Sequence, residues 1–353
     1  MGRAARRSSR AVTIAMVAER AGVSAMTVSN VLNGQKRVNE AKRSAVLAAV
    51  EALNYVPNPA ARALASAAPA QIGLLYHDPQ VAYLSALLLG ALNATRRLGA
   101  QLLLQHAPQA DVGAALEALR TLKRSGANAF LLPAPFCELL GGSADLAALG
   151  LPVVALAPGA DLPGLPGVRI DDFAAARELT ERLLQLGHRR IAFIGGPSAH
   201  SASRSRMDGY RAALEGRGIP FDPVLSVPGA FTFESGLAAA GALLTMTPRP
   251  TAIFAANDDM AAAVVSAAHR MGLHIPADLS VVGFDDTPIA TRIWPTLTTV
   301  RQPVALISEA AVEALVDVLK SPAEPPPLTS RLLPYEIIER DSTGPLVRPP
   351  LGN

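Results

Sequence analysis

The side-chain amide of Asn30 offers the most specific chemistry in the N-terminal part of the chain. A carboxamide donates and accepts hydrogen bonds at once, which matches the paired groups that adenine presents in the major groove of DNA. Ala25 and Met26 form no such bonds through their side chains, but they can contact a thymine methyl group or contribute shape. Thr27 and Ser29 suit phosphate oxygens or backbone groups. Together these five side chains predict a surface that reads duplex DNA.

These side chains act together only if a helix presents them on one face. Apolar residues recur at helical spacing within Val17–Ala21 and again within Val28–Leu32. Gly22 follows the first run, where an ending helix favours the left-handed backbone that glycine adopts without strain. Ser24 precedes the second run, where its hydroxyl can cap a new helix. The pattern predicts a helix-turn-helix with residues 25, 26, 29 and 30 pointing outward.

A third helix is expected over Glu40–Leu53, capped by Asn39. Lys42 and Arg43 would lie outward near its start, where they could contact phosphates, although a solvated helix face accounts for either charge equally well. The inward positions would close a small three-helix core with Val28 and Leu32, and they are Val46, Ala49, Val50 and Leu53.

Charge separates this head from the rest of the chain. Residues 1–66 contain ten Lys and Arg and three acids, a net charge of +7, whereas the whole chain carries +3 and the remainder therefore −4. A basic head on a slightly acidic body is typical of a protein that binds a polyanion at one end. A surface helical hairpin without a partner would not need this charge. Residues 1–11 are basic and without periodicity, and are expected to be a disordered arm.

The run VTIAMVAERAGVSAMTVSNVLNG, followed by RVNEAKRSAVLAAVEALNYVPNPAARAL, resembles the head of lactose-repressor (LacI/GalR) family transcription regulators. The resemblance continues through most of the chain. It implies a ligand-responsive regulator, usually a repressor, that binds a near-palindromic operator as a homodimer, with a small-molecule effector such as a sugar. It places the DNA-binding domain at residues 12–56 and adds Thr13 and Asn33 to the predicted contacts. Many members carry Arg at the position of Asn30, so this chain is expected to read a different base.

Residues 57–68 are expected to form a hinge. The sequence Tyr55–Pro59 ends the third helix, because proline cannot continue one. The seven residues 59–65 are too few for a stable isolated helix, and a plain linker is the simple alternative. The resemblance implies that the hinge folds on DNA, with Leu64 wedged into the minor groove beside Arg62.

From Gln71 onward, short apolar strands alternate with helices in two series, which is typical of parallel sheets covered on both faces. We expect a two-lobed α/β body like that of periplasmic binding proteins, with two doubly wound sheets over residues 69–341. The expected first lobe spans about 69–167 and 297–327, and the second about 168–296 and 328–341. Residues 342–353 are expected to be a disordered tail.

Ligands of such sheets bind beyond the carboxyl ends of the strands. Arg206 matches the effector-binding arginine of the family, and a guanidinium suits paired sugar hydroxyls or a carboxylate. Phe231 matches an aromatic that stacks on the ligand, although core packing fits it equally well. Asn257 and Asp285 follow strands and match ligand-binding positions of the family. Asn257 could bind ligand, cap a helix or do both, and Asp285 could bind ligand or form a turn. The resemblance also implies two rim residues from the first lobe, Asp78 and Tyr83.

Other classes of function find less support. The six histidines lack metal-ligand spacing, and no catalytic constellation or nucleotide-binding loop stands out, so no enzyme, metal or cofactor is expected. Gly195-Gly196 could cradle an anion, but a tight turn explains it as well. The single Cys137, the absence of an apolar N-terminal segment and the lack of a membrane-spanning run predict a cytoplasmic protein. A solute-binding protein without regulatory role is the alternative.

Overall fold

The computed structural model describes residues 13–32, 39–53, 55, 69–77, 81–321 and 323–346, without the side chains of Ser29, Leu32 and Val81. Contacts divide the chain into two compact units, residues 1–69 and 70–353. No helix among the described residues is long and apolar enough to cross a membrane.

The first unit contains the three predicted helices, α1 (Ile14–Ala21), α2 (Ala25–Leu32) and α3 (Glu40–Ala52). Gly22 ends α1 with φ 63°, and the Ser24 hydroxyl accepts a hydrogen bond from the Thr27 amide at 3.2 Å. Asn39 caps α3, which ends at Ala52, one residue earlier than expected. The buried core of this unit consists of Val17, Ala18, Val28, Val31, Val46, Ala49 and Tyr55. The helical pattern does not predict Tyr55 as a core residue.

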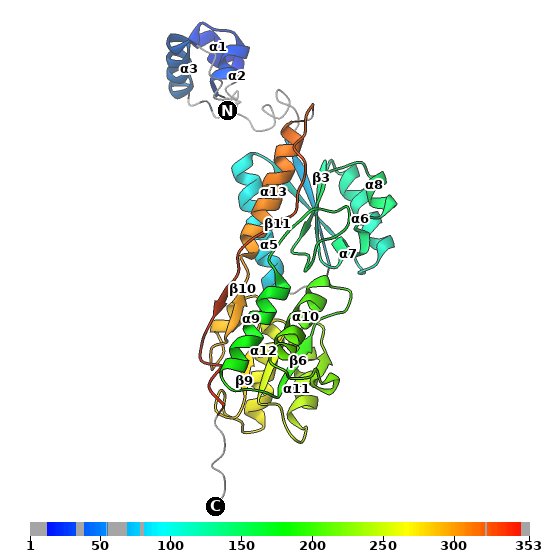
Figure 1. The fold of residues 1–353 in the computed structure, drawn as a ribbon. Helices are drawn as coiled ribbons and strands as arrows, with labels where there is room; N and C mark the ends of the chain where they lie inside the picture. The colour runs from blue at the N-terminus through cyan, green and yellow to red at the C-terminus, as the bar shows by residue number, and fades with distance from the viewer. Residues whose placement is uncertain are drawn as a thin grey trace, which may run out of the picture. The chain divides into compact units, whose positions relative to one another are not determined.

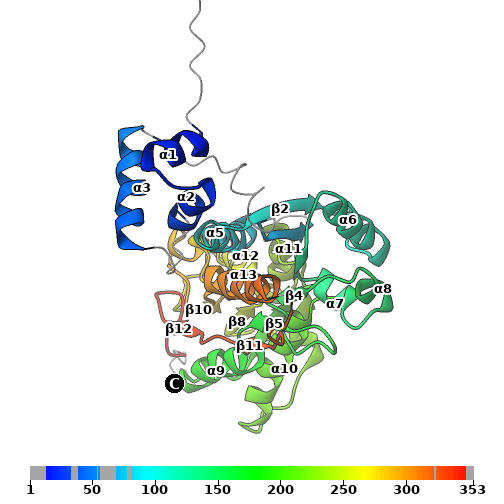
Figure 2. The same ribbon diagram turned by 90° about the horizontal axis from the view of Figure 1, so that it is seen from above.

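The second unit has two lobes (Figure 1). The first is a parallel six-stranded sheet in the order β11-β5-β4-β3-β1-β2. Its strands are β1 (Gln71–Tyr76), β2 (Gln101–His106), β3 (Ala129–Pro133), β4 (Val153–Leu156), β5 (Gly167–Arg169) and β11 (Arg331–Leu332). Figure 2 shows α5 (Val81–Leu98) and α13 (Val304–Lys320) together on one face of this sheet. On the other lie α6 (Val112–Arg124), α7 (Phe136–Leu140) and α8 (Ala144–Ala148).

The second lobe is a parallel four-stranded sheet in the order β7-β6-β8-β9. Its strands are β6 (Ile191–Gly195), β7 (Ser226–Pro228), β8 (Ala252–Ala255) and β9 (Ser280–Val282). Helix α9 (Asp172–Gln185) packs on α10 (Ser201–Glu215), and α11 (Phe233–Leu244) packs on α12 (Asp258–Arg270). Two short 3₁₀ helices, η1 (Pro223–Leu225) and η2 (Pro288–Thr291), complete it. Strands β10 (Thr299–Arg301) and β12 (Glu336–Ile338) form an antiparallel pair, and Figure 1 shows β10 where the chain passes between the lobes.

Two predicted lobe boundaries are wrong. Residues 168–169 and 331–332 are predicted to lie in the second lobe, but β5 and β11 pair with each other in the first-lobe sheet. The cause is that β4 returns to β5 through a loop without a helix, and Gly167 packs so tightly against Pro158 and Ala155 that a side chain there would clash. Strand β7 begins at Ser226, directly after η1 ends at Leu225.

The start of the expected disordered tail is ordered. Ser342 is fully buried, donates a hydrogen bond to the Val281 carbonyl at 2.6 Å and accepts one from the Thr298 amide at 2.8 Å. His188 contacts the Gly344 carbonyl at 3.1 Å. These polar partners hold residues 342–346 on the second lobe, so the expectation of disorder is wrong for this part of the tail.

Candidate functional site

The outward face of α2 is arranged as predicted. Met26 is 70 % exposed, Ala25 is exposed and Asn30 is half-buried, whereas Val28 and Val31 are buried on the opposite side. The predicted contacts Asn33, Arg62 and Leu64 lie outside the described residues, as do residues 1–11 of the arm, and nothing is described of the Ser29 side chain.

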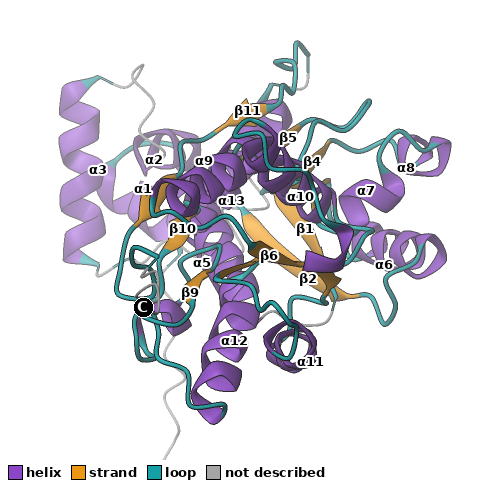
Figure 3. Cartoon of the chain, turned by 60° about the horizontal axis from the view of Figure 1, so that its bottom comes forward, coloured by secondary structure: helices purple, strands orange, loops and turns teal. Residues whose placement is uncertain are grey.

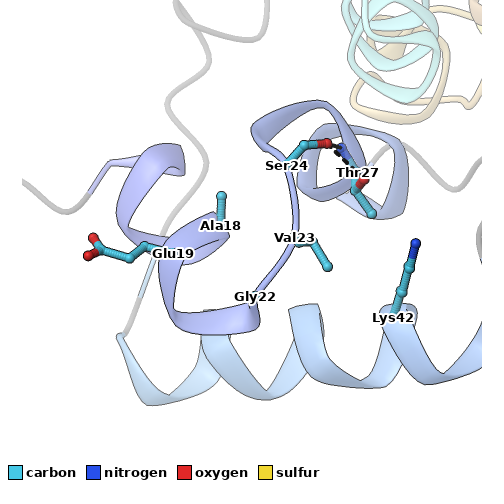
Figure 4. Close-up of a pocket in the computed structure, with 7 residues that line it drawn as sticks. All are labelled: Ala18, Glu19, Gly22, Val23, Ser24, Thr27 and Lys42. Atoms are coloured by element: carbon cyan, nitrogen blue, oxygen red, sulfur yellow. Dashed lines mark hydrogen bonds between the residues drawn. The ribbon is translucent and has the colours of Figure 1, made fainter.

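Hydroxyl and ammonium groups gather beside the start of α2. The Ser24 and Thr27 hydroxyl oxygens lie 2.9 Å apart. At the start of α1, the Thr13 side chain makes no capping hydrogen bond. Figure 4 shows a hollow bordered by both hydroxyls, into which Lys42 extends from α3 while Glu19 points away. Helix N-termini carry partial positive charge, so this hollow suits an anion such as a phosphate.

A cavity of about 590 Å³ lies between the two lobes of the body. Its walls come from α5 and the carboxyl ends of β1, β3 and β4 in the first lobe, and from α10 and the loops after β6, β7 and β9 in the second. Most of its lining is apolar, with few polar groups, which is typical of sites for small molecules. The lining includes four of the six predicted effector residues, Tyr83, Arg206, Phe231 and Asp285.

Arg206 is the central charge of this cavity. It is 5 % exposed; its Nε donates to Asp172 Oδ1 at 2.8 Å and its Nη1 to the Ala256 carbonyl at 2.6 Å. Nη2 lies 3.6 Å from Asp285 Oδ1, and the guanidinium stacks 3.7 Å from the ring centroid of Phe284. Burial lowers the pKa of Arg206, but the nearby carboxylates of Asp172 and Asp285 raise it by more than burial lowers it. The net shift is upward, so the guanidinium stays charged. An arginine so fixed is preorganised for bonding a ligand.

Burial raises the pKa of both carboxylates beside Arg206, those of Asp285 and Asp172. Burial raises the pKa of Asp285 to about 7, although Arg206 and a 2.6 Å hydrogen bond from Gln302 Nε2 oppose the shift. Burial also raises the pKa of Asp172, against the pull of Arg206. Asp285 therefore changes charge near neutral pH while lining the cavity, and its φ of 107° is rare for a residue with a side chain.

This shift predicts a pH dependence of stability. Between its ordinary pKa near 4 and about 7, Asp285 holds a proton in the folded chain but not in the unfolded one. The free energy of unfolding should therefore fall as pH rises through that window, relative to the variant Asp285→Asn. Urea denaturation of both proteins from pH 4 to 8 measures the difference, and the comparison cancels the contributions of His188 and His200. A difference independent of pH would contradict the assignment.

Phe231 packs its ring at the cavity wall, 5 % exposed and 5.5 Å from the His200 ring. Its φ is 61°, and Asn257 Nδ2 donates to its carbonyl at 2.9 Å. Asn257 itself does not line the cavity, because its Oδ1 caps α12 by accepting from the Met260 amide. Of its two expected roles, the structure shows the helix cap, with the added task of fixing the Phe231 backbone.

Several cavity residues were missed by sequence reasoning. His77, held by the Ala107 carbonyl at 2.9 Å, and His200 both line it, and burial lowers the pKa of His200, which favours its neutral form. The histidines were considered only as metal ligands, although strand-end and helix-start positions could have indicated them. Among the described residues no group of three His, Cys, Asp or Glu could hold a metal. Asp78 lies outside the described residues.

Gly195 is the last residue of β6 and Gly196 follows it directly, so the doublet lies at the end of a strand and the tight turn expected there is not formed. A side chain at Gly196 would overlap the Phe231 ring and the Ser203 hydroxyl, so the glycine lets these groups approach the end of β6. Close packing therefore explains the glycine at position 196.

Two family models match the chain. Residues 13–58 match the model described as bacterial regulatory proteins, lacI family, and residues 180–343 match the periplasmic binding protein-like domain.

Individual relatives match over most of their length. The transcriptional regulator CelR of Thermobifida fusca is 34% identical over 326 residues, which are 86% of this chain and 91% of that protein. A solved CelR–cellobiose complex has a TM-score of 0.69 at 31% identity, covering 94% of this chain and 99% of that one. The lac repressor dimer bound to operator and an anti-inducer has a TM-score of 0.74 at 28% identity, and the match covers 95% of this chain and 100% of that one.

Proposed function

The chain belongs to the LacI family of bacterial regulatory proteins and is a DNA-binding transcription regulator, and we propose that it is a repressor controlled by a sugar bound between its lobes. One observation carries the proposal: the same chain joins an exposed helix-turn-helix face to a two-lobed body with a partly polar cavity. Mobility-shift titration of a selected operator, with and without cellobiose or ribose, tests it. A change in operator affinity that saturates with one sugar is expected.

We assign base reading to α2 and phosphate contacts to its surroundings. The proposed reading face consists of the exposed Ala25 and Met26 and the half-buried Asn30. The Ser24 and Thr27 hydroxyls lie at the start of α2, and we add Thr13, Ser29 and Asn33 to complete the proposed contacts. Residues 12–56 are the proposed DNA-binding domain and 57–68 the hinge, with Arg62 and Leu64 entering the minor groove. The effector domain follows from residue 69.

Lys42 gives a direct test of the phosphate assignment. The variant Lys42→Ala should weaken binding to all duplexes about equally, and the slope of log affinity against log salt should become shallower by about 0.9, since one phosphate contact is lost. Binding titrations at several salt concentrations on a selected operator and on random duplex measure this. A loss confined to the operator would instead assign Lys42 to base reading.

The cavity chemistry suits a sugar. Sugar hydroxyls can donate to Asp285 and accept from Arg206, while Phe231 and Tyr83 offer aromatic surface for the apolar face of a ring. One relative is solved with cellobiose and another LacI-family regulator, from Enterococcus faecium, with ribose. A ligand that prefers one arrangement of the lobes would shift the population of that arrangement and hence operator affinity.

The proposed assembly is a homodimer, matching two half-sites of a near-palindromic operator. Support comes from the first lobe, where α5 and α13 pack at Gly90, whose missing side chain lets it meet Ala305. Three leucines close to this crossing in sequence remain exposed by 49–60 %, namely Leu89, Leu92 and Leu306. Apolar side chains of this size on adjoining helices are typical of a surface that a partner covers.

The rival functions fit less well. A solute-binding protein would not need the basic head, and its relatives would not be transcription regulators. We propose that the chain has no catalytic activity and acts in the cytoplasm, where its operator lies. Hydride or phosphoryl transfer in assays with nucleotide cofactors would overturn the first of these statements.

A further inference from the structure

The two lobes bind each other through a polar contact on one side of the cavity. Glu138 on α7 of the first lobe accepts two hydrogen bonds at Oε1 from Ser201 of the second, one from the amide at 3.0 Å and one from the hydroxyl at 2.5 Å. The amide of Gly159, in the loop after β4, donates to Ser201 Oγ at 2.8 Å. Ser205 Oγ donates to the Gly159 carbonyl at 2.8 Å.

Glu138 replaces a cap that α10 lacks. His200 stands at the N-cap position of α10 but makes no capping bond through its side chain. The first amides of a helix need acceptors, and a carboxylate is favoured there by the helix dipole. The acceptor for the Ser201 amide comes from the opposite lobe, so this amide has its protein acceptor only while the lobes are together.

The contact is close as well as polar. A side chain at Gly159 would overlap the backbone of Ala202, so the first-lobe loop lies directly on the first turn of α10. Ser201 is 2 % exposed, and Cys137 Sγ donates to the second Glu138 oxygen at 2.9 Å. The Glu138 carboxylate is therefore held in one place by groups from both lobes.

The contact lies across the body from the connections between lobes. Figures 1 and 3 show α7 on the side away from β10, near which the chain passes between lobes. A rotation of the lobes about those connections would separate Glu138 from Ser201 first. The same turns of α10 that bind the first lobe through Ser201 and Ser205 also line the cavity through Ala202 and Arg206.

We propose that Glu138 is a positioning residue that latches the lobes closed and thereby holds Arg206 in the cavity. The latch consists of Glu138 and Gly159 on the first lobe and Ser201 and Ser205 on the second. Its regulatory meaning rests on the proposed function, because an effector that moves α10 must strain or reinforce these bonds. The latch itself is a property of the chain without DNA or sugar.

Distance measurement between spin labels tests the latch directly. Labels at Asp145→Cys and Arg217→Cys, both exposed positions, report the separation of the lobes in the full chain. Cys137 is fully buried, and burial raises the pKa of its thiol, which keeps it unlabelled. In the labelled chain that retains Glu138, we expect one narrow distribution of label-to-label distances. In Glu138→Ala a longer-distance population should grow about tenfold, as expected for loss of charge-assisted hydrogen bonds.

Two further variants separate positioning from general damage. Glu138→Gln keeps an acceptor oxygen at the same place, so it should restore most of the closed population. Glu324→Ala removes an exposed carboxylate from the loop after α13 and should change nothing. An unchanged distribution in Glu138→Ala, or equal broadening in Glu324→Ala, would overturn the proposal. Because neither DNA nor sugar is needed, failure here would leave the proposed function standing, and failure of operator binding would leave the latch standing.

Discussion

Replacing Arg206 by alanine is expected to lower the free energy of unfolding by about 3–5 kcal/mol and to abolish stabilisation by the effector. The loss of stability follows because Asp172, buried at 2 % exposure, would lose the cation that compensates its charge. The loss of effector response follows because Arg206 is the only positively charged side chain among the described residues that line the cavity. Urea denaturation measures the first effect and thermal shift with cellobiose and ribose the second.

The two effects can be separated. The double variant Arg206→Met, Asp172→Asn removes the cation and its buried charge together, so it should recover most of the lost stability without recovering the sugar response. Arg204→Ala, exposed on the same helix and bonded to the Ser198 carbonyl, is the matched control and should retain both properties. A sugar that stabilises Arg206→Ala and the unsubstituted chain equally would remove Arg206 from the site.

Replacing Asn30 by alanine is expected to cost about 1–3 kcal/mol of discrimination at one base pair in each half-site, because the bonds of its amide to one base are lost. Affinity for random duplex should change little, since phosphate contacts supply most non-specific binding. Competition titrations with operators substituted at single positions locate the affected pair.

The variant Asn30→Arg sharpens this test. A guanidinium pairs with the two acceptors of guanine, so this variant should prefer guanine at the base pair where the unsubstituted chain prefers adenine. Equal weakening of Asn30→Ala on operator and random duplex would show that Asn30 does not read a base.

Local sequence signals predicted the head and most elements of the body. Gly22, Ser24 and Asn39 are caps whose types determine where helices begin and end, and the structure has each in that role. The strands β6 and β8 appeared as short apolar runs because both faces of their sheet are covered.

The sequence predictions are wrong where contacts between distant residues determine the structure. Only sheet pairing reveals that β5 and β11 belong to the first lobe, because their residues look the same in either sheet. Ser342 and Gly344 are ordered by partners more than forty positions earlier, which no local pattern contains. The resemblance identified Arg206 and Asp285, but the latch pairs Glu138 with Ser201, 63 positions apart, and only the folded chain brings them together.

The central claim is that α2 reads a specific sequence under control of the cavity, and selection from a randomised duplex library by the full chain tests it most directly. We predict enrichment of a near-palindrome whose half-sites lie about one helical turn apart, with loss of one position in both halves for Asn30→Ala. The enriched duplex should bind with an affinity that an effector sugar alters. Recovery of no common sequence, with equal affinity for every duplex at low and high salt, would contradict the account.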